Sequence, residues 1–137
     1  MNAPLLLDTC AAIWAAEDQL PSAATEILTR RYREGEQVFI SPITGWEIGL
    51  LFSRGRLRGP LSPLEYFRRL AGLPGVRLTP MPPELLLASS FLPGSPPHDP
   101  ADRIMATTAR EYGYTLMTRD ALLLAYAQEG HLRAVPC

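Results

Sequence analysis

The sequence contains no lysine, and all 13 of its basic residues are arginines. Phosphoaspartate sites of the receiver or haloacid type normally use a lysine beside the reactive carboxylate, so the absence of lysine argues against that chemistry. The glycine-rich phosphate loop of Walker-type nucleotide-binding proteins is also absent. The sequence therefore gives no support to phosphoryl transfer of either kind.

Cysteine is scarce, and the two cysteines, Cys10 and Cys137, stand near opposite ends of the chain. Thiols so placed form neither a disulfide framework nor the paired spacing of a metal knuckle. We expect a buried small side chain at Cys10 and an ordinary thiol at Cys137. No apolar run is long enough to span a bilayer, and residues 1–4 lack the basic and apolar stretches of a secretion signal. A cytoplasmic protein without a membrane partner is the expectation.

The chain does contain material for a compact core. With 137 residues, of which 47% are hydrophobic and 20% charged, it has the size of a single domain, which we expect to cover 1–137. Short apolar runs alternate with helical stretches, and this alternation predicts an α/β fold, a three-layer α/β/α sandwich with a central, mostly parallel sheet. Strands are expected at 5–7, 38–40, 76–78, 115–118 and 132–135, and helices at 10–16, 22–34, 44–53, 63–71, 83–91, 99–112 and 121–128.

Four acidic residues, Asp8, Glu47, Asp102 and Asp120, stand where an apolar run gives way to a helical stretch. In parallel α/β sheets, residues distant in sequence converge at the carboxyl ends of the strands. Two carboxylates about 4 Å apart repel each other by roughly 4 kcal/mol at an effective dielectric constant of about 20, so a cluster requires cations or protons. The pattern therefore predicts a site for Mg²⁺ or Mn²⁺.

Three of these acids also have a simpler interpretation as helix-start residues. Asp8 and Asp120 follow apolar strands and could cap the next helix. Asp102 could interact with the helix dipole in the first turn, although it shares an inward stripe with Met105. Asp99 directly precedes a proline, which makes it a good N-cap without any catalytic role.

Glu47 is informative because of the helical stretch around it. Apolar residues at helical spacing place Glu47 on an inward stripe, where an unpaired glutamate is rare, although a salt-bridged side chain would serve equally well. Thr44 could hydrogen-bond a site carboxylate or a phosphate, or could cap the helix. The expected stripe consists of Ile43, Trp46, Leu50 and Leu51.

The arginines are clustered, although the formal net charge is only -1. Arginine forks suit phosphate oxygens, so local basic patches could contact nucleic acid beside an acidic site. A solvated helix face with some salt bridges explains each cluster equally well. The clusters are Arg30, Arg31 and Arg33; Arg54, Arg56 and Arg58; and Arg68 with Arg69.

Four short blocks carry the acids in a fixed order: LLLDT at 5–9, SPITGWEI at 41–48, HDPADR at 98–103 and LMTRD at 116–120. In their order and spacing, over nearly the whole chain, these blocks resemble PIN-domain ribonucleases, in particular the VapC-like toxins of type II toxin-antitoxin systems. Many relatives carry an aromatic residue where this chain has Ala101, and we expect the exchange to affect packing and not chemistry.

The resemblance implies a Mg²⁺- or Mn²⁺-dependent endoribonuclease. It implies that water activated by the cation hydrolyses RNA, that the protein forms a homodimer, and that a VapB-like antitoxin holds it inactive. The implied catalytic and metal-binding residues are Asp8, Glu47, Asp102 and Asp120, with Asp99, Thr118 and Thr44 as secondary site residues and Arg54, Arg56, Arg58 and Arg103 as RNA-binding residues.

Two other functions remain open from the sequence. The chain could be a non-catalytic PIN-like module that uses its acidic edge to dock a basic partner peptide, although the presence of all four acids argues against this. It could also be a metal nuclease directed at DNA, because the same carboxylate chemistry hydrolyses either backbone. The small size, without added strand-threading elements, disfavours that alternative.

Overall fold

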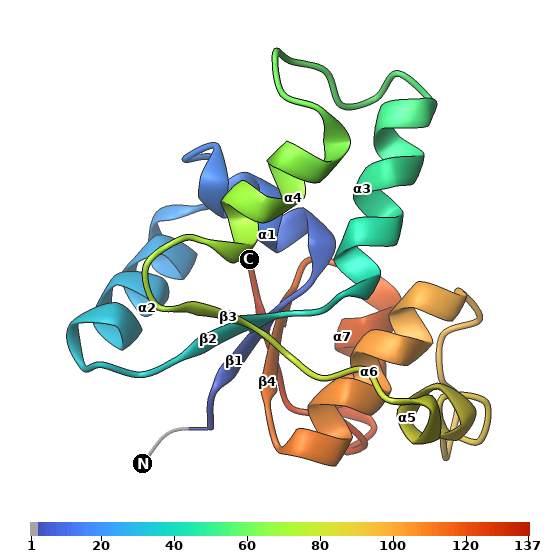
Figure 1. Ribbon diagram of the computed structural model, residues 1–137. Helices are drawn as coiled ribbons and strands as arrows, with labels where there is room; N and C mark the ends of the chain where they lie inside the picture. The colour runs from blue at the N-terminus through green and yellow to red at the C-terminus, as the bar shows by residue number, and fades with distance from the viewer. Residues whose placement is uncertain (1–2) are drawn as a thin grey trace.

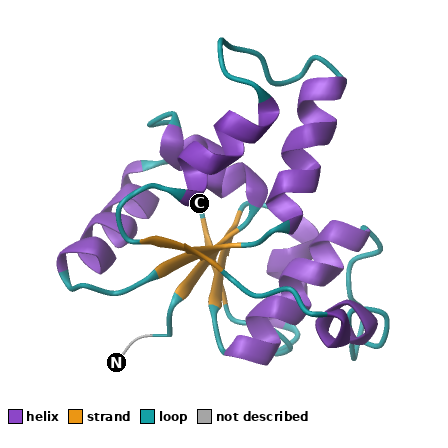
Figure 2. Cartoon of the chain, viewed as in Figure 1, coloured by secondary structure: helices purple, strands orange, loops and turns teal. Residues whose placement is uncertain are grey.

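The computed structural model describes residues 3–137 and has at its centre a five-stranded sheet (Figures 1 and 2). The strand order is β3-β2-β1-β4-β5, and every pair of neighbouring strands is parallel. The predicted α/β sandwich is confirmed, with a sheet that is wholly and not merely mostly parallel. The strands are β1 (Leu5–Leu7), β2 (Val38–Ile40), β3 (Val76–Leu78), β4 (Thr115–Thr118) and β5 (Ala134–Pro136).

Helices cover both faces of this sheet (Figure 2). One buried cluster lies against α1, α2 and α4, and a second lies against α6 and α7, while α3 contributes to both. The bounds are α1 (Thr9–Ala16), α2 (Ser22–Arg33), α3 (Ile43–Ser53), α4 (Pro63–Ala71), α5 (Pro83–Ala88), α6 (Pro100–Tyr112) and α7 (Ala121–Gln128). None of the helices in residues 3–137 has the length and apolar character needed to cross a membrane.

The three leucines of β1 explain why this strand is central. Leu5 and Leu7 belong to one buried cluster and Leu6 to the other, as the alternation of side chains along a strand requires. Burying each leucine stabilises the fold by roughly 1.5–3 kcal/mol. In register, Leu7 pairs with Ile40 of β2 and with Met117 of β4. Residues that follow these strands are therefore brought to the same edge of the sheet.

Two predicted elements differ from the structure by more than one residue at an end, whereas four of the other helices differ by a single residue. The helix expected at 83–91 ends at Ala88, and the Ser89 hydroxyl then donates a hydrogen bond of 2.6 Å to the Leu86 carbonyl. The edge strand expected at 132–135 is found at Ala134–Pro136. The expectation about a secretion signal at residues 1–4 includes Met1 and Asn2, which lie outside the described residues.

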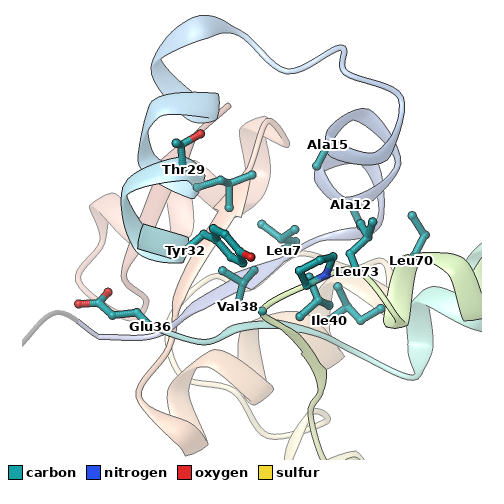
Figure 3. Close-up of a pocket in the computed structure, with 14 residues that line it drawn as sticks. Leu7, Ala12, Ala15, Thr29, Tyr32, Glu36, Val38, Ile40, Leu70 and Leu73 are labelled. Atoms are coloured by element: carbon teal, nitrogen blue, oxygen red, sulfur yellow. The ribbon is translucent and has the colours of Figure 1, made fainter. Parts of the chain in front are cut away.

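An open apolar cavity of about 450 Å³ lies on the face covered by α1, α2 and α4. Figure 3 shows the strand side chains Leu7, Val38 and Ile40 beneath it, with Ala15 of α1 and Tyr32 of α2 at its sides. None of the acids predicted to form the metal site lines this cavity. It is therefore a feature of the packing, separate from the acidic edge.

Candidate functional site

Asp8 directly follows β1 and is the N-cap of α1. Its Oδ1 accepts a hydrogen bond of 2.8 Å from the main-chain N of Ala11, and its Oδ2 accepts one of 2.5 Å from the hydroxyl of Thr118. Burial raises the pKa of Asp8, while the hydrogen bonds from Thr118 and Ala11 lower it in part. Asp8 is thus a fixed carboxylate at the end of the central strand.

Thr118, the last residue of β4, connects this carboxylate to the next one. Its fully buried Oγ1 also accepts a hydrogen bond of 3.0 Å from the main-chain N of Asp120. Asp120 is the N-cap of α7, and its Oδ1 accepts from the main-chain N of Leu122 at 3.0 Å and of Leu123 at 2.9 Å. The ends of β1 and β4 therefore carry two acids linked through one hydroxyl group.

A second pair of acids, Asp99 and Asp102, begins α6. Asp99 is the N-cap, and its Oδ1 accepts a hydrogen bond of 3.0 Å from the main-chain N of Asp102. Met105 and Ala106 are buried, which confirms the inward stripe expected next to Asp102. Burial, together with the charges of Asp120 and Asp99, raises the pKa of Asp102 to about 7. A carboxyl group with such a pKa changes from its protonated to its ionised form near neutral pH.

Glu47 of α3 is oriented by two threonines. The Thr9 hydroxyl donates a 2.5 Å hydrogen bond to Oε1 of Glu47 and lies 3.0 Å from Oγ1 of Thr44. A hydroxyl carries one proton, so Thr44 must donate to Thr9 while Thr9 donates to Glu47. Burial raises the pKa of Glu47, and the hydrogen bond from Thr9 lowers it in part.

The stripe predicted around Glu47 was wrong in its membership. Trp46 is 54% exposed, whereas Ile43, Thr44 and Ile48 are buried. Ile43 and Thr44 lie about one turn of helix before Glu47, and Ile48 directly follows it, so the glutamate does lie on the inward side. Thr44 is not a helix cap either, because it lies inside α3 after Pro42, the N-cap.

All the predicted acids line one cleft of about 390 Å³. They come from the starts of α1, α6 and α7 and from the first half of α3, and α3 and α6 lie side by side in Figure 1. In residues 3–137, no three acidic, histidine or cysteine side chains stand close enough together to hold one metal ion. The acids therefore line the walls of a cleft without forming a closed ligand set. They are Asp8, Glu47, Asp99, Asp102 and Asp120.

Sequence reasoning missed other residues that line the cleft. Cys10 lines the cleft and is exposed as a residue, so the expectation of a buried side chain was wrong. Its thiol group is nevertheless partly covered, and this partial burial, with the charges of Asp8 and Glu47, raises the pKa of Cys10. Trp14 and Arg119 also line the cleft. Arg119 stands between Thr118 and Asp120, and that position was the only signal in the sequence.

The arginines expected to contact RNA lie in two different settings. Arg54, Arg56 and Arg58 are exposed in the segment that joins α3 to α4, at the far end of α3 from its start (Figure 1). Arg54, the C-cap of α3, stands seven positions after Glu47, which is about 10 Å along the helix axis. Arg103 instead donates from Nε to the carbonyl oxygen of Ser89 at 3.0 Å and from Nη1 to that of Pro97 at 2.9 Å.

Comparison with known proteins agrees with this arrangement. The model of the PIN domain family matches residues 5–134. The chain is 30% identical to Ribonuclease VapC22 of Mycobacterium tuberculosis over 123 residues. This matched region covers 89% of this chain and 91% of the relative.

Two solved structures share the fold. VapBC2 from Rickettsia felis, bound to a DNA fragment from its promoter, matches with a TM-score of 0.67 at 12% identity, over 97% of this chain and 98% of that one. FitAcB from Neisseria gonorrhoeae matches with a TM-score of 0.56 at 18% identity, over 95% of each chain. Because the PIN domain model matches nearly the whole chain and Ribonuclease VapC22 is 30% identical to it, the chain belongs to the PIN domain family and is a VapC-like member of it.

Proposed function

We propose that this chain is a metal-dependent endoribonuclease whose catalytic and metal-binding residues are Asp8, Glu47, Asp102 and Asp120. The observation that supports this most directly is the cleft itself, in which acids from four separate segments lie together. Burial raises the pKa of three of them, Asp8, Glu47 and Asp102. A fold that tolerates such crowded acids usually does so for a function.

The residues of the cleft fit a hard divalent cation. Carboxylate and hydroxyl oxygens are the ligands that Mg²⁺ and Mn²⁺ prefer, and no thiolate or imidazole cluster in residues 3–137 favours another metal. Capping uses Oδ1 of Asp8 and Oδ1 of Asp120, so Oδ2 of Asp120 remains for ligation, and Oδ2 of Asp8 keeps a second lone pair beside the one that accepts from Thr118. When bound, the cation would activate a water molecule and neutralise charge on the scissile phosphate.

The chain's own residues would orient these ligands. Thr118 fixes Oδ2 of Asp8, and Thr9, itself held by Thr44, fixes Oε1 of Glu47. Such supporting hydrogen bonds typically change metal affinity or activity by about 10- to 100-fold. Burial and the neighbouring acids raise the pKa of Asp102 to about 7, so Asp102 would release its proton on binding the cation, which offsets the repulsion among the carboxylates. Asp99 would act as the cap that positions Asp102.

RNA would reach the cleft past the basic segment after α3. Arg54, Arg56 and Arg58 are exposed, and Arg54 stands about 10 Å along the helix from Glu47, a distance of about three nucleotides at a rise of about 3.4 Å each. Arg103 is a weaker candidate because main-chain carbonyls already accept from its Nε and Nη1. We assign it to holding the loop before α6.

The proposed partners follow from the relatives. One relative is named Ribonuclease VapC22, and the sequence blocks that carry the acids resemble the VapC-like toxins of toxin-antitoxin systems. We therefore propose that this chain is the toxin of such a pair, that it acts as a homodimer in the cytoplasm, and that a VapB-like antitoxin inhibits it.

The decisive experiment is cleavage of total cellular RNA by the purified chain with Mg²⁺ or Mn²⁺, beside a chelator control and the Asp8→Asn variant. Discrete RNA fragments that disappear in both controls would support the proposal. Cleavage of single-stranded DNA alone would favour the DNA nuclease. A folded, partner-free chain that cuts neither polymer, and whose melting temperature does not respond to Mg²⁺ or Mn²⁺, would favour the docking module.

A further inference from the structure

Arg119 is the one basic side chain that lines the carboxylate cleft in the described part of the chain. The segment between β4 and α7 carries it there, between Thr118 and Asp120. A cleft lined by five carboxylates repels a phosphodiester, so a fixed positive charge inside it needs an explanation.

Two interactions hold the Arg119 guanidinium in place. Its Cζ lies 3.9 Å from the centre of the Trp14 ring, and its Nε donates a hydrogen bond of 3.0 Å to the carbonyl oxygen of Cys137. Cys137 is itself fixed, because its main-chain N donates to the Thr118 carbonyl at 3.2 Å. The arginine is therefore anchored on an aromatic face and on the residue that follows β5.

Held by these anchors, Arg119 pairs directly with no carboxylate in the described residues, although its charge lowers the pKa of Asp8 in part. The ion pair present among residues 3–137 joins Arg31 to Glu36, and Arg119 forms none with Asp8 or Asp120. With Nε engaged, the edge formed by Nη1 and Nη2 remains, and no acceptor in the described residues occupies it. A stacked guanidinium with that edge unoccupied is suited to a two-pronged interaction with phosphate oxygens.

We propose that Arg119 binds a phosphodiester group of the RNA substrate, with Trp14 and the Cys137 carbonyl as the groups that position its guanidinium. This inference rests on the proposed nuclease function and adds to it a residue that binds the backbone from inside the cleft. It assigns the cleft a mixed character, in which carboxylates hold the cation and one arginine holds the substrate phosphate.

The test compares Arg119→Gln and Arg119→Lys with the parent chain and with Arg77→Gln. Arg77 is a matched control because it is exposed on β3, at the opposite edge of the sheet. Binding of a short fluorescein-labelled single-stranded RNA is measured in chelator at several salt concentrations, and cleavage of total RNA is measured with Mg²⁺ or Mn²⁺. Melting temperatures verify that each variant folds.

Arg119→Gln is expected to weaken binding and to lower kcat/KM by about 10- to 100-fold, as loss of a charge-assisted hydrogen bond does. The slope of log affinity against log salt should fall by about 0.7, the value for one neutralised phosphate on a single strand. Arg119→Lys should keep the slope but recover only part of the affinity, because an ammonium group neither stacks nor forks. Arg77→Gln should match the parent chain.

Trp14 gives an independent arm of the test. Trp14→Phe keeps an aromatic face and should retain binding, whereas Trp14→Leu should weaken binding several-fold. In the Arg119→Gln background, Trp14→Leu should have little further effect on binding, because both residues act through one interaction with the phosphate. Additive losses would mean that Trp14 does not act through the arginine.

The outcomes separate this inference from the proposed function. If the parent chain cleaves RNA and Arg119→Gln cleaves and binds it equally well, the role of Arg119 is wrong while the nuclease stands. A loss of activity that follows melting temperature, with an unchanged salt slope, also overturns it. If the folded parent chain neither binds nor cleaves RNA, the proposed function fails and this inference fails with it.

Discussion

Oγ1 of Thr118 lies 2.5 Å from Oδ2 of Asp8 and donates a hydrogen bond to it across 110 positions of sequence. The same atom accepts a hydrogen bond from the main-chain N of Asp120. A single buried hydroxyl thus sets the orientation of one acid and the position of the next. Because each strand end supplies one of these groups, the parallel register of β1 and β4 is what brings them together.

Replacing Thr118 with valine should therefore damage both stability and activity. Thr118→Val keeps the shape of the side chain but leaves the Asp120 N–H without its acceptor, which should lower the free energy of unfolding by about 1–3 kcal/mol. Cleavage should fall about 10-fold or more, because Asp8 loses its orientation. Thr118→Ser restores the hydroxyl and should stay close to the parent chain in urea unfolding and cleavage assays. Equal behaviour of the two variants would contradict the role of the hydroxyl.

Asp8→Asn should abolish RNA cleavage without harming the fold. Burial raises the pKa of Asp8, so its charge is unfavourable in the folded chain, and the amide should leave stability unchanged or slightly higher. We expect cleavage to fall by at least about 100-fold, because a ligand charge is lost. Glu84→Gln, a neutralisation at an exposed position of α5, is the control and should change neither property. Retained cleavage in folded Asp8→Asn would sink the assignment.

Stability should depend on pH through Asp102. Its pKa is raised from 3.8 to about 7, so between these values the folded chain binds a proton that the unfolded chain has released. The free energy of unfolding should therefore fall as the pH rises from about 4 to about 7. Asp8 and Glu47, whose pKa values are also raised, contribute to the same slope.

Asp102→Asn should flatten this pH dependence. At pH 4 the variant should melt near the parent chain, because both side chains are then neutral. At pH 8 it should melt higher by about 3–5 °C, the shift that about 1 kcal/mol gives a domain of this size, a modest gain because solvent screens the part-exposed carboxylate. Parallel melting curves for the two proteins at every pH would show that Asp102 does not titrate in this range.

Charge reversal in the segment after α3 tests the proposed RNA path. Changing Arg54, Arg56 and Arg58 to glutamate should weaken binding of single-stranded RNA and flatten its salt dependence, by about 0.7 in slope for each phosphate that the chain no longer neutralises. Reversal of the exposed Arg30 and Arg33 on α2 together with Arg77 on β3 is the control with the same charge change. If both sets behave alike in anisotropy titrations, binding depends only on overall charge and the segment is not the path.

The apolar cavity beside α1 offers a stabilising substitution. Ala15 lines it, whereas its neighbour Ala16 is exposed and does not. Ala15→Met should fill part of the cavity and raise the free energy of unfolding by about 0.5–1 kcal/mol, because methionine adapts to irregular spaces and forms helices well. Ala16→Met should change stability little in urea unfolding. A destabilised Ala15→Met would mean that the cavity walls cannot accept the longer side chain.

Much of the fold could be predicted because each short strand is an apolar run with clear breaks around it. The expected bounds of β1, β2, β3 and β4 agree with the structure. Boundaries failed where local hydrogen bonds compete with a helix, as at Ser89, whose hydroxyl bonds back to Leu86 after α5 ends. The extent of the single domain and the catalytic roles stay predictions.

The interpretation of the acids as helix caps and their interpretation as neighbours in one acidic cleft do not exclude each other. Asp8, Asp99 and Asp120 are N-caps, as their positions suggested, and the same three residues line the cleft. This follows from the architecture, because helices that start at one edge of a parallel sheet bring their caps to that edge. Sequence could not reveal the Trp14–Arg119 interaction, since it depends on how α1 packs against the end of β4.

The strand order also determines when the cleft can exist. β1 is made early and lies at the centre of the sheet, but its neighbour β4 is encoded more than a hundred residues later. During synthesis, β1 therefore lacks its neighbouring strand, and Asp8 lacks the hydrogen bond from Thr118, until Thr115–Thr118 has left the ribosome. A chain that has been synthesised only as far as α6 therefore contains Asp8, Glu47, Asp99 and Asp102 but lacks the hydroxyl that orients Asp8, so the cleft forms only after β4 has joined the sheet.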